Sequence, residues 1–201
     1  IQKFNLKTGD KILDIGCDRG FFLDEARRHG FDVTGIEPLD KARIYCKSIG
    51  LNVLESFSGL NSKFDVITMW HSLEHNIKPL AALKDINNHL VDGGYLLIRV
   101  PDFDCIWRKI FGEKWIWFQP DNHYFHFTIP ALQNLLLLAG FQIIEMSQRK
   151  PNNSLTKSFD RLATKTFGKY FHYESNIKKR LSRAYQNMTG VEIFAIFKKS
   201  N

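Results

Sequence analysis

This chain of 201 residues contains no extended apolar segment. No apolar stretch approaches the roughly 18 consecutive residues that a membrane-spanning helix needs. The first ten residues, IQKFNLKTGD, contain neither the apolar core of a signal peptide nor an initiator Met. No export signal is therefore expected, and a cytoplasmic location is the prediction.

Cysteine is also scarce, and its pattern excludes two kinds of small protein. The three residues Cys17, Cys46 and Cys105 are odd in number and form no Cys-x-x-Cys pair. A disulfide framework or a structural zinc site would need paired cysteines at short spacings. Unpaired cysteines instead fit a reducing compartment.

The net positive charge of the chain is concentrated in a single segment. Residues 150–190 contain nine Lys or Arg and two acidic residues, which accounts for the whole net charge of +7 and leaves the rest of the chain neutral. The apolar residues of this segment recur at helical spacing, so an amphipathic basic helix is expected. Two interpretations stay open, a solvated helix packed by its apolar face or peripheral contact with an anionic membrane.

The remaining chain alternates short apolar runs with helical patterns, which predicts one α/β domain over 1–201 with a doubly wound, mostly parallel sheet. Helices are expected near 20–29, 39–49, 79–91 and 128–140. Two late apolar stretches, FQIIEM and VEIFAIF, are expected to add an antiparallel last strand to a seven-stranded Rossmann-like sheet. The other strands are expected at Lys11–Ile15, Asp32–Glu37, Asn52–Leu54, Asp65–Trp70 and Gly94–Val100.

The glycine loop after the first expected strand, in KILDIGCDRGFFL, lacks the glycine needed for a dinucleotide site. The G-x-G-x-x-G fingerprint fails because Asp18 replaces the second glycine and Phe21 replaces the last small residue. An anionic Asp18 would also repel a pyrophosphate. Glu37 ends the second strand, where a carboxylate commonly binds ribose hydroxyls. A ribose-bearing ligand without phosphate and with positive charge fits this loop better, and S-adenosylmethionine (SAM) has those properties.

The segment LDIGCDRGFF resembles motif I of the class I SAM-dependent methyltransferases, whose pattern D-x-G-x-G-x-G is matched at Asp14, Gly16 and Gly20. Asp18 is the departure from that pattern, and it must avoid or tolerate a positive φ. Asp is among the residues that tolerate positive φ best.

Later segments extend the resemblance to one group within this class, the ubiquinone-biosynthesis-like small-molecule methyltransferases. The block from WHSLEHNIKP through DGGYLLIRVPD, and the later DNHYFHFTIP, match segments of that group. The similarity covers about 10–148 and 191–199. It implies SAM as the cofactor and a small-molecule acceptor, with an oxygen nucleophile such as a quinone precursor, sugar or lipid-linked metabolite. The oligomeric state is left open.

The resemblance also implies where the cofactor would bind. Gly16, Cys17 and Gly20 would approach its methionyl part through backbone groups, and Glu37 would hold its ribose. Pro38 and Leu39 would lie near the adenine, with Glu55 or Ser56 as an acid or hydroxyl partner. The full set of expected cofactor-binding residues is Asp14, Gly16, Cys17, Asp18, Gly20, Glu37, Pro38, Met69 and Trp70.

A hydroxyl nucleophile needs a base near neutral pH, and His is the natural choice. His71 and His123 are the expected catalytic residues, with Tyr124 as an alternative from the later loop. Glu74 and His75 are expected to brace the next helix, and His126 to pack. Although His71, Glu74 and His75 could suggest a metal, their spacing is weak evidence and no metal is expected.

Segment 101–127 holds three of the four Trp residues, which predicts an aromatic lid over the acceptor or, alternatively, aromatic packing at the sheet edge. Two other functions are alternatives to small-molecule methyl transfer. A nucleic-acid methyltransferase using 150–190 is disfavoured, because MWHS replaces the Asn/Asp-Pro-Pro-aromatic motif of adenine-N6 enzymes. A SAM-binding protein without catalysis is suggested only by Asp18.

Overall fold

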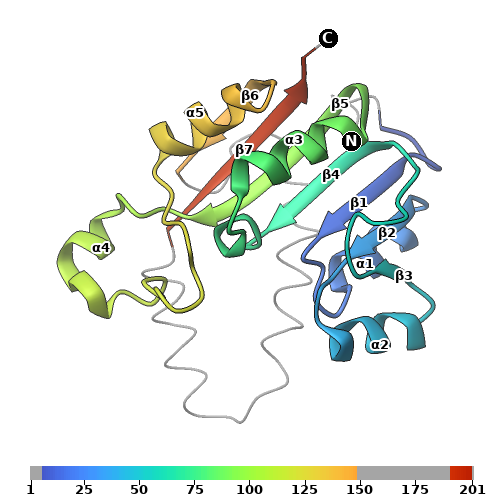
Figure 1. Ribbon diagram of the computed structural model, residues 1–201, viewed down its shortest axis with the longest axis horizontal. Coiled ribbons are helices and arrows are strands. Elements are labelled where there is room, and N and C mark those ends of the chain that lie inside the picture. Colours follow the sequence, from blue (N-terminus) through green and yellow to red (C-terminus); the bar gives the residue numbers. More distant parts are fainter. Residues whose placement is uncertain (1–5, 149–190, 201) are drawn as a thin grey trace.

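The computed structural model describes residues 6–148 and 191–200, and its centre is one seven-stranded sheet (Figure 1). The strand order is β3-β2-β1-β4-β5-β7-β6. The strands are β1 (Lys11–Ile15), β2 (Asp32–Ile36), β3 (Asn52–Leu54), β4 (Phe64–Trp70), β5 (Leu90–Pro101), β6 (Phe141–Ser147) and β7 (Glu192–Lys199).

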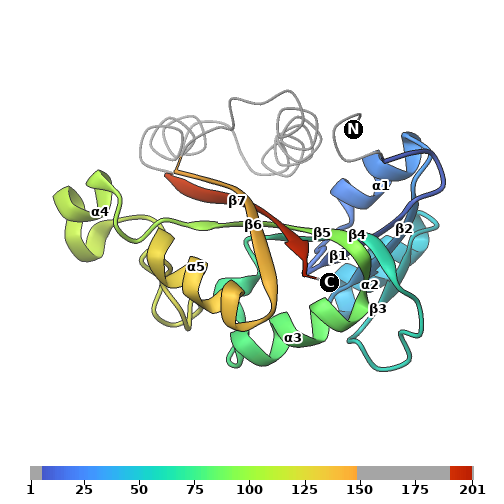
Figure 2. The same ribbon diagram turned by 90° about the horizontal axis from the view of Figure 1, so that it is seen from above.

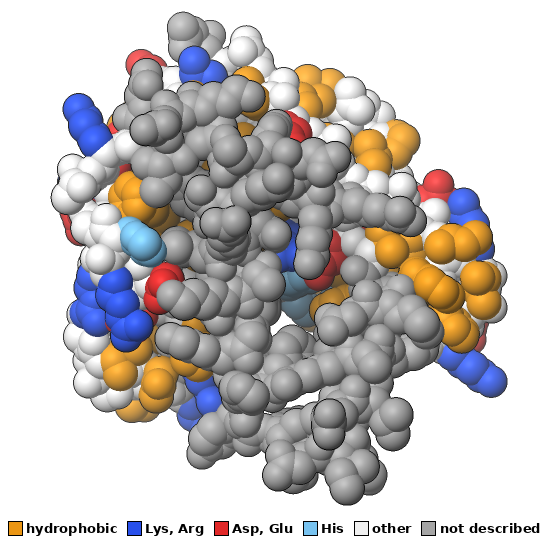
Figure 3. All heavy atoms as spheres, turned by 180° about the vertical axis from the view of Figure 1, so that it is seen from behind, with side chains coloured by type: hydrophobic (Ala, Val, Ile, Leu, Met, Phe, Trp, Pro, Cys, Tyr) orange, Lys and Arg blue, Asp and Glu red, His pale blue; other side chains and the backbone are white. Residues whose placement is uncertain are grey.

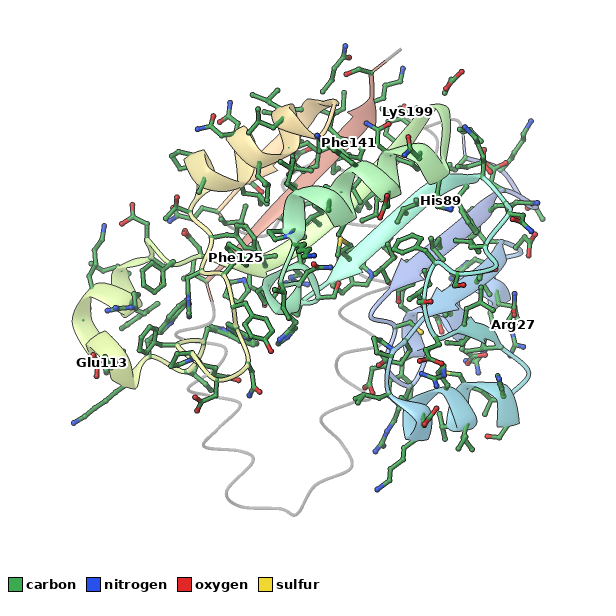
Figure 4. The ribbon with its side chains drawn as sticks, viewed as in Figure 1. Arg27, His89, Glu113, Phe125, Phe141 and Lys199 are labelled. Carbon is green, nitrogen blue, oxygen red and sulfur yellow. The ribbon has the colours of Figure 1, made fainter. Side chains whose placement is uncertain are left out.

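The direction of the strands confirms the expected fold class. The pairs β1–β2, β2–β3, β1–β4 and β4–β5 are parallel, whereas β7 runs antiparallel to both β5 and β6. Phe141 of β6 pairs with Lys199 of β7, and both are labelled in Figure 4. The chain therefore has a Rossmann-like α/β fold with an antiparallel last strand.

Helices cover both faces of this sheet, as Figure 2 shows from above: α1 lies on one side, and α3 and α5 lie on the other. The α-helices are α1 (Phe21–Arg28), α2 (Asp40–Ser48), α3 (Pro79–His89), α4 (Ile106–Phe111) and α5 (Ile129–Leu138). Two short 3₁₀ turns, η2 (Leu73–His75) and η3 (Gly112–Lys114), complete the described elements.

Burial on both faces explains why the strands are almost continuously apolar. Along β4, Val66 and Trp70 pack in the core on the α1 side. Ile67 and Met69 alternate with them and pack in the core under α3 and α5. The two-residue period of a strand thus divides one short apolar run between two cores.

The helix boundaries follow local signals, with one correction. Thr128 caps α5 as expected, because its Oγ1 accepts from the Ala131 N–H at 3.4 Å. The helix expected over 79–91 ends earlier, at His89. Leu90 is fully buried and pairs with Phe64 of β4, so tertiary packing makes it part of β5. That strand therefore begins at Leu90 and not at the predicted Gly94.

Segment 101–127 forms an outer lobe that contains α4 and η3 and extends away from the sheet (Figure 1). Hydrophobic side chains gather on this lobe in Figure 3, and Ile106 and Ile110 are more than half exposed. A bridge between Asp102 and Phe127 holds the two ends of the segment together. Its expected role as a lid remains a prediction.

The basic segment 150–190 lies outside the described residues, so the expected amphipathic helix and its membrane contact stay predictions. In the parts of the chain that are described, no helix combines the length and the apolar character needed to cross a bilayer.

Candidate active site

Three loops meet at the carboxyl ends of β1, β2 and β4. Gly16, Glu37 and His71 each follow directly after one of these strands. β1 lies between β2 and β4 in the sheet, so the chain reverses its direction of winding at β1. Open α/β sheets bind ligands at such a switch point, beyond the carboxyl ends of the strands.

The loop after β1 is held close to its neighbours. The N–H groups of Gly16 and Cys17 both donate to the Ile36 carbonyl, at 2.8 and 3.2 Å. Gly16 has a φ of 74°, and a Cβ at this position would lie 2.6 Å from the Ser72 Cβ. Glycine is therefore required here both by the backbone conformation and by the approach of the loop after β4.

Asp18 adopts the left-handed conformation that its position demands, with a φ of 45°. Its N–H donates to Glu37 Oε2 at 2.8 Å, and the Leu39 N–H donates to Glu37 Oε1 at 2.9 Å. Glu37 is only 5% exposed. The two amides fix the orientation of this carboxylate, and each of its oxygens retains a lone pair for a ligand hydroxyl.

Asp14 is buried beneath the loop. The Thr68 hydroxyl donates to Asp14 Oδ1 at 2.6 Å. Burial raises the pKa of Asp14 to about 7, the Thr68 hydrogen bond opposes that rise, and the negative charge of Glu37 adds to it. A buried carboxyl so close to a second carboxylate would be stabilised by a cation at this position.

The residues present therefore fit SAM. Asp14, Asp18 and Glu37 supply acidic groups around one glycine loop, where a sulfonium and an ammonium would be favoured and a pyrophosphate would be repelled. Because Gly16 has no Cβ, Ser72 of the loop after β4 can lie close to this glycine loop. The backbone conformation of Gly16 and the fixed orientation of the Glu37 carboxylate are compatible with the SAM that the sequence predicts.

The expected adenine side is organised by a residue that the sequence analysis missed. Arg43 donates from Nη1 to the carbonyl oxygens of Glu37 and Pro38, at 2.7 and 2.5 Å. Its Nη2 pairs with Asp40 and lies 3.6 Å from Glu55 Oε2. Arg43 is thus a clamp on the backbone that carries Glu37.

An apolar surface lies beside this clamp. Leu39 is 67% exposed although it is a large apolar residue, and Pro38 is also exposed. This surface is where the adenine was expected, and that assignment remains a prediction.

Cys17 contributes its backbone to the loop and its side chain to the core. Its Sγ lies so close to Gly35 that a Cβ there would meet it at 2.6 Å. A hydrogen bond with Cys46 and burial both raise the pKa of the Cys17 thiol, so it stays protonated. The Cys46 Sγ donates to the Asp18 carbonyl at 3.1 Å, which adds another tie to the loop.

Met69 and Trp70 are placed in the cores rather than in an open site. Met69 is 1% exposed among the residues under α3 and α5. The Trp70 ring lies 5.4 Å from Phe22 and 6.2 Å from Phe194, between centroids. Any contact of these two residues with a cofactor would have to come from their backbone.

His71 is held between two carboxylates. Its Nε2 donates to Glu192 Oε1 at 3.0 Å, and its Nδ1 lies 3.5 Å from Glu74 Oε1. Burial alone would lower the pKa of His71, but Glu192 and Glu74 raise it to about 9. The Trp117 ring stacks on the imidazole, with centroids 5.0 Å apart. His71 is therefore an imidazolium near neutral pH.

His75 and His123 face each other at the same site, with ring centroids 4.8 Å apart. The Nδ1 of His75 donates to the Asn122 carbonyl at 2.8 Å, and that of His123 donates to the Trp117 carbonyl at 3.0 Å. Burial lowers the pKa of His123, which favours its neutral form. The two expected catalytic histidines, His71 and His123, thus differ in charge.

The loop that carries His123 is anchored to the turn after β4. The N–H of Phe125, labelled in Figure 4, donates to the Glu74 carbonyl at 3.2 Å. His126 packs as expected, 4.9 Å from Phe103 between ring centroids. Tyr124 is 57% exposed.

Glu74 does not brace the next helix as expected. Neither of its carboxylate oxygens accepts a hydrogen bond within the described part of the chain. The side chain of Asn76 instead stabilises the turn before α3, because its Oδ1 accepts from the Lys78 N–H at 2.9 Å.

Two further positioning residues were not found from sequence. Glu192 comes from β7, far along the chain from His71, and it also pairs with Arg99 of β5. A charged residue at the start of a strand gives no local signal of such a contact. Thr68 had a weak signal, since it is a polar residue inside the apolar run VITMW.

Comparison with known families places the site in context. The model of a family described as a methyltransferase domain matches residues 1–146. A tRNA U34 carboxymethyltransferase of Aliarcobacter butzleri is 33% identical over 165 residues, which is 71% of this chain and 50% of that protein. A ubiquinone biosynthesis O-methyltransferase of Actinobacillus pleuropneumoniae is 36% identical over 110 residues, 47% of each. The chain thus spans about half the length of these curated relatives.

A solved structure shares the fold of the described residues. The plantazolicin methyltransferase BamL, solved in complex with a triazolic desmethylPZN analog and SAH, superposes with a TM-score of 0.69. The match covers 99% of this chain and 80% of BamL at 16% identity.

Proposed function

Since the chain belongs to the methyltransferase-domain family of class I, SAM-dependent enzymes, we propose that it transfers a methyl group from SAM to an oxygen of a small-molecule acceptor. The observation that carries this proposal is the glycine loop of Gly16 and Asp18 with the oriented carboxylate of Glu37 beside it. SAM supplies an electrophilic methyl group on a sulfonium when bound.

The residues of this chain would bind and orient that donor. Glu37 would accept from the ribose hydroxyls through the lone pairs that the two backbone amides leave free. Asp14 and Asp18 favour the positive charge of the methionyl end. In-line methyl transfer depends mainly on such alignment and on exclusion of water.

We assign the removal of the acceptor proton to the turn after β4 and the loop facing it. His71 is less suited to this role, because Glu192 and Glu74 raise its pKa to about 9 and favour its protonated form. His75 and His123 both donate from Nδ1 to a carbonyl, which leaves Nε2 as the ring nitrogen that could accept a proton. A deprotonated acceptor oxygen is the nucleophile that the reaction requires.

The aromatic side chains near His71 and the zero net charge outside residues 150–190 support a small-molecule acceptor. Trp117 stacks on His71, and the rings of Phe103, Phe118 and His126 cluster in the lobe next to it. Outside 150–190 the chain carries no net charge, so the body supplies no general attraction for phosphate.

A tRNA acceptor is the second candidate, because the Aliarcobacter butzleri relative covers 71% of this chain at 33% identity. In that case, methyl transfer would depend on the basic segment 150–190 and would fall steeply with rising salt.

The test is a transfer assay with methyl-labelled SAM and the full chain. Catechols and other small phenols would be compared with bulk tRNA, at low and at physiological salt. Label on an organic-soluble phenol supports the proposal. Label on tRNA alone, suppressed by salt, would replace it with the second candidate.

A further inference from the structure

We propose that Glu74, His75 and His123 form a binding site for one divalent metal ion of the zinc class. Each residue offers one ligand atom, and these atoms lie within 4.8 Å of one another. Two of the residues come from the turn η2 and the third from the outer lobe, so the ion would link the lobe to the sheet. The inference does not depend on methyl transfer.

The strongest observation is the state of Glu74. Its side chain is 1% exposed, and among the described residues neither oxygen accepts a hydrogen bond. A buried carboxylate without donors is costly unless a cation balances it. The nearest cationic group, His71 Nδ1, is 3.5 Å from one oxygen and leaves the other without a partner.

The two histidines are arranged as metal ligands commonly are. A backbone carbonyl can only accept, so the Nδ1 atoms of His75 and His123 must carry the ring protons. The lone pair of each neutral ring is then on Nε2, the atom left to coordinate. Metal-bound histidines typically donate their other ring N–H to a carbonyl or carboxylate in this way.

His71 is excluded from the ligand set although sequence spacing placed it beside Glu74 and His75. Its Nε2 is held by Glu192 at 3.0 Å and its Nδ1 faces Glu74. His71 accordingly contributes no ligand atom to the group formed by Glu74, His75 and His123. The structure thus replaces His71 with His123, which is 48 positions further along the chain than His75 and could not be paired with it from local spacing.

Two histidine nitrogens and one carboxylate oxygen suit Zn²⁺ with a fourth position open to water or substrate. Ligand atoms bound to one tetrahedral zinc at about 2.1 Å lie roughly 3.4 Å apart, so small side-chain rotations would close the site. A cation there would compensate Glu74 and fix the His123 loop. Because the bound ion would occupy both Nε2 lone pairs, it would replace the two histidines in deprotonation by lowering the pKa of an acceptor oxygen bound to it.

The test measures metal binding directly on the full chain. After treatment with a chelator, the protein is titrated with Zn²⁺ against a chromophoric competitor, and Co²⁺ is added separately to record its visible absorption. One equivalent of zinc and an intense tetrahedral Co²⁺ spectrum are expected. Absence of stoichiometric zinc binding would overturn the proposal, whatever the result of the methyl-transfer assay.

Matched variants locate the ion. Glu74→Gln and His123→Ala should each weaken zinc binding by at least tenfold, whereas His29→Gln, at the residue directly after α1 and outside this cluster, should bind zinc as the parent does. Far-UV circular dichroism of each variant without metal checks that it folds. Unchanged zinc affinity in a folded His123→Ala variant would place the ion elsewhere and refute this site.

Discussion

The backbone N–H of Asp18 donates to the carboxylate of Glu37 at 2.8 Å, and this bond joins the loop after β1 to the loop after β2. Asp18 has a φ of 45° in this loop, a conformation that glycine adopts without strain. The residue that departs from the glycine motif therefore keeps the geometry of that motif. The same bond orients the acid that is expected to hold the ribose.

Substitutions at Asp18 should separate backbone conformation from charge. Asn and Gly both tolerate positive φ, so Asp18→Asn and Asp18→Gly should keep the free energy of unfolding within about 0.5 kcal/mol of the parent. Asp18→Val should cost about 1–2 kcal/mol, because a β-branched residue is strained there. Urea unfolding measures all three. Equal stability of the Val and Asn variants would refute the left-handed conformation.

Gly16→Ala should be destabilising for two reasons, the positive φ and the contact with Ser72. We expect a loss of about 1–3 kcal/mol in unfolding free energy. Ser72→Gly removes the Cβ that the new methyl would meet. The double variant should therefore recover the steric part and keep the strain, which a double-mutant cycle measures. Strict additivity of the two changes would contradict the close approach.

Asp14 predicts a pH dependence of stability in the ligand-free protein. Its pKa rises from 3.8 in the unfolded chain to about 7 in the fold, so the folded state binds the proton more tightly. The stability contributed by Asp14 is fully present below pH 4 and is lost as pH rises through 7. Asp14→Asn should remove this loss. The free energy of unfolding of the variant, relative to that of the parent, should therefore increase between pH 5 and pH 8.

Thr68→Val provides the control for Asp14. The Thr68 hydroxyl lowers the pKa of Asp14, and without it the pKa should rise further. The loss of stability would then extend to higher pH than in the parent. Parallel stability curves for the parent and Asp14→Asn from pH 5 to pH 8 would contradict the assignment to Asp14.

Glu192 and Asp92 both belong to ion pairs, but the first pair is partly buried whereas Asp92 is exposed. Glu192 binds His71 and Arg99, which hold its pKa at about 2 despite burial. Glu192→Gln would leave two cations with one partner fewer and should cost about 3–5 kcal/mol. Asp92→Asn breaks an exposed pair with Lys199 and should cost less than about 1 kcal/mol. Urea unfolding compares them, and similar losses would argue against the buried network.

Much of the fold follows from local pattern. The alternation of apolar runs and helical segments predicts the strand and helix order, and Thr128 marks the start of α5. The predicted element boundaries are wrong where tertiary contacts determine the structure. Leu90 leaves the predicted helix because it is buried against β4, and no property of the sequence DGG reveals that.

The site was predictable where the loops after adjacent strands of the sheet meet, and not where a contact comes from the last strand or from the outer lobe. Gly16, Asp18 and Glu37 lie in the loops directly after β1 and β2, so strand positions predict that they converge. The charge of His71 depends on Glu192, which lies on the last strand in the chain. The pairing of His75 with His123 likewise depends on how the outer lobe folds back over η2.

The most direct measurement is calorimetric titration of the protein with SAM and with S-adenosylhomocysteine, using NAD as the unrelated ribose-bearing control. The account predicts micromolar binding of the first two, no binding of NAD, and at least a tenfold loss in Glu37→Ala, worth about 1.4 kcal/mol. Asp32→Asn, an exposed change at the start of the same strand, should bind as the parent does. Equal SAM affinity in the parent and Glu37→Ala, or tighter binding of NAD than of SAM, would contradict the central claim.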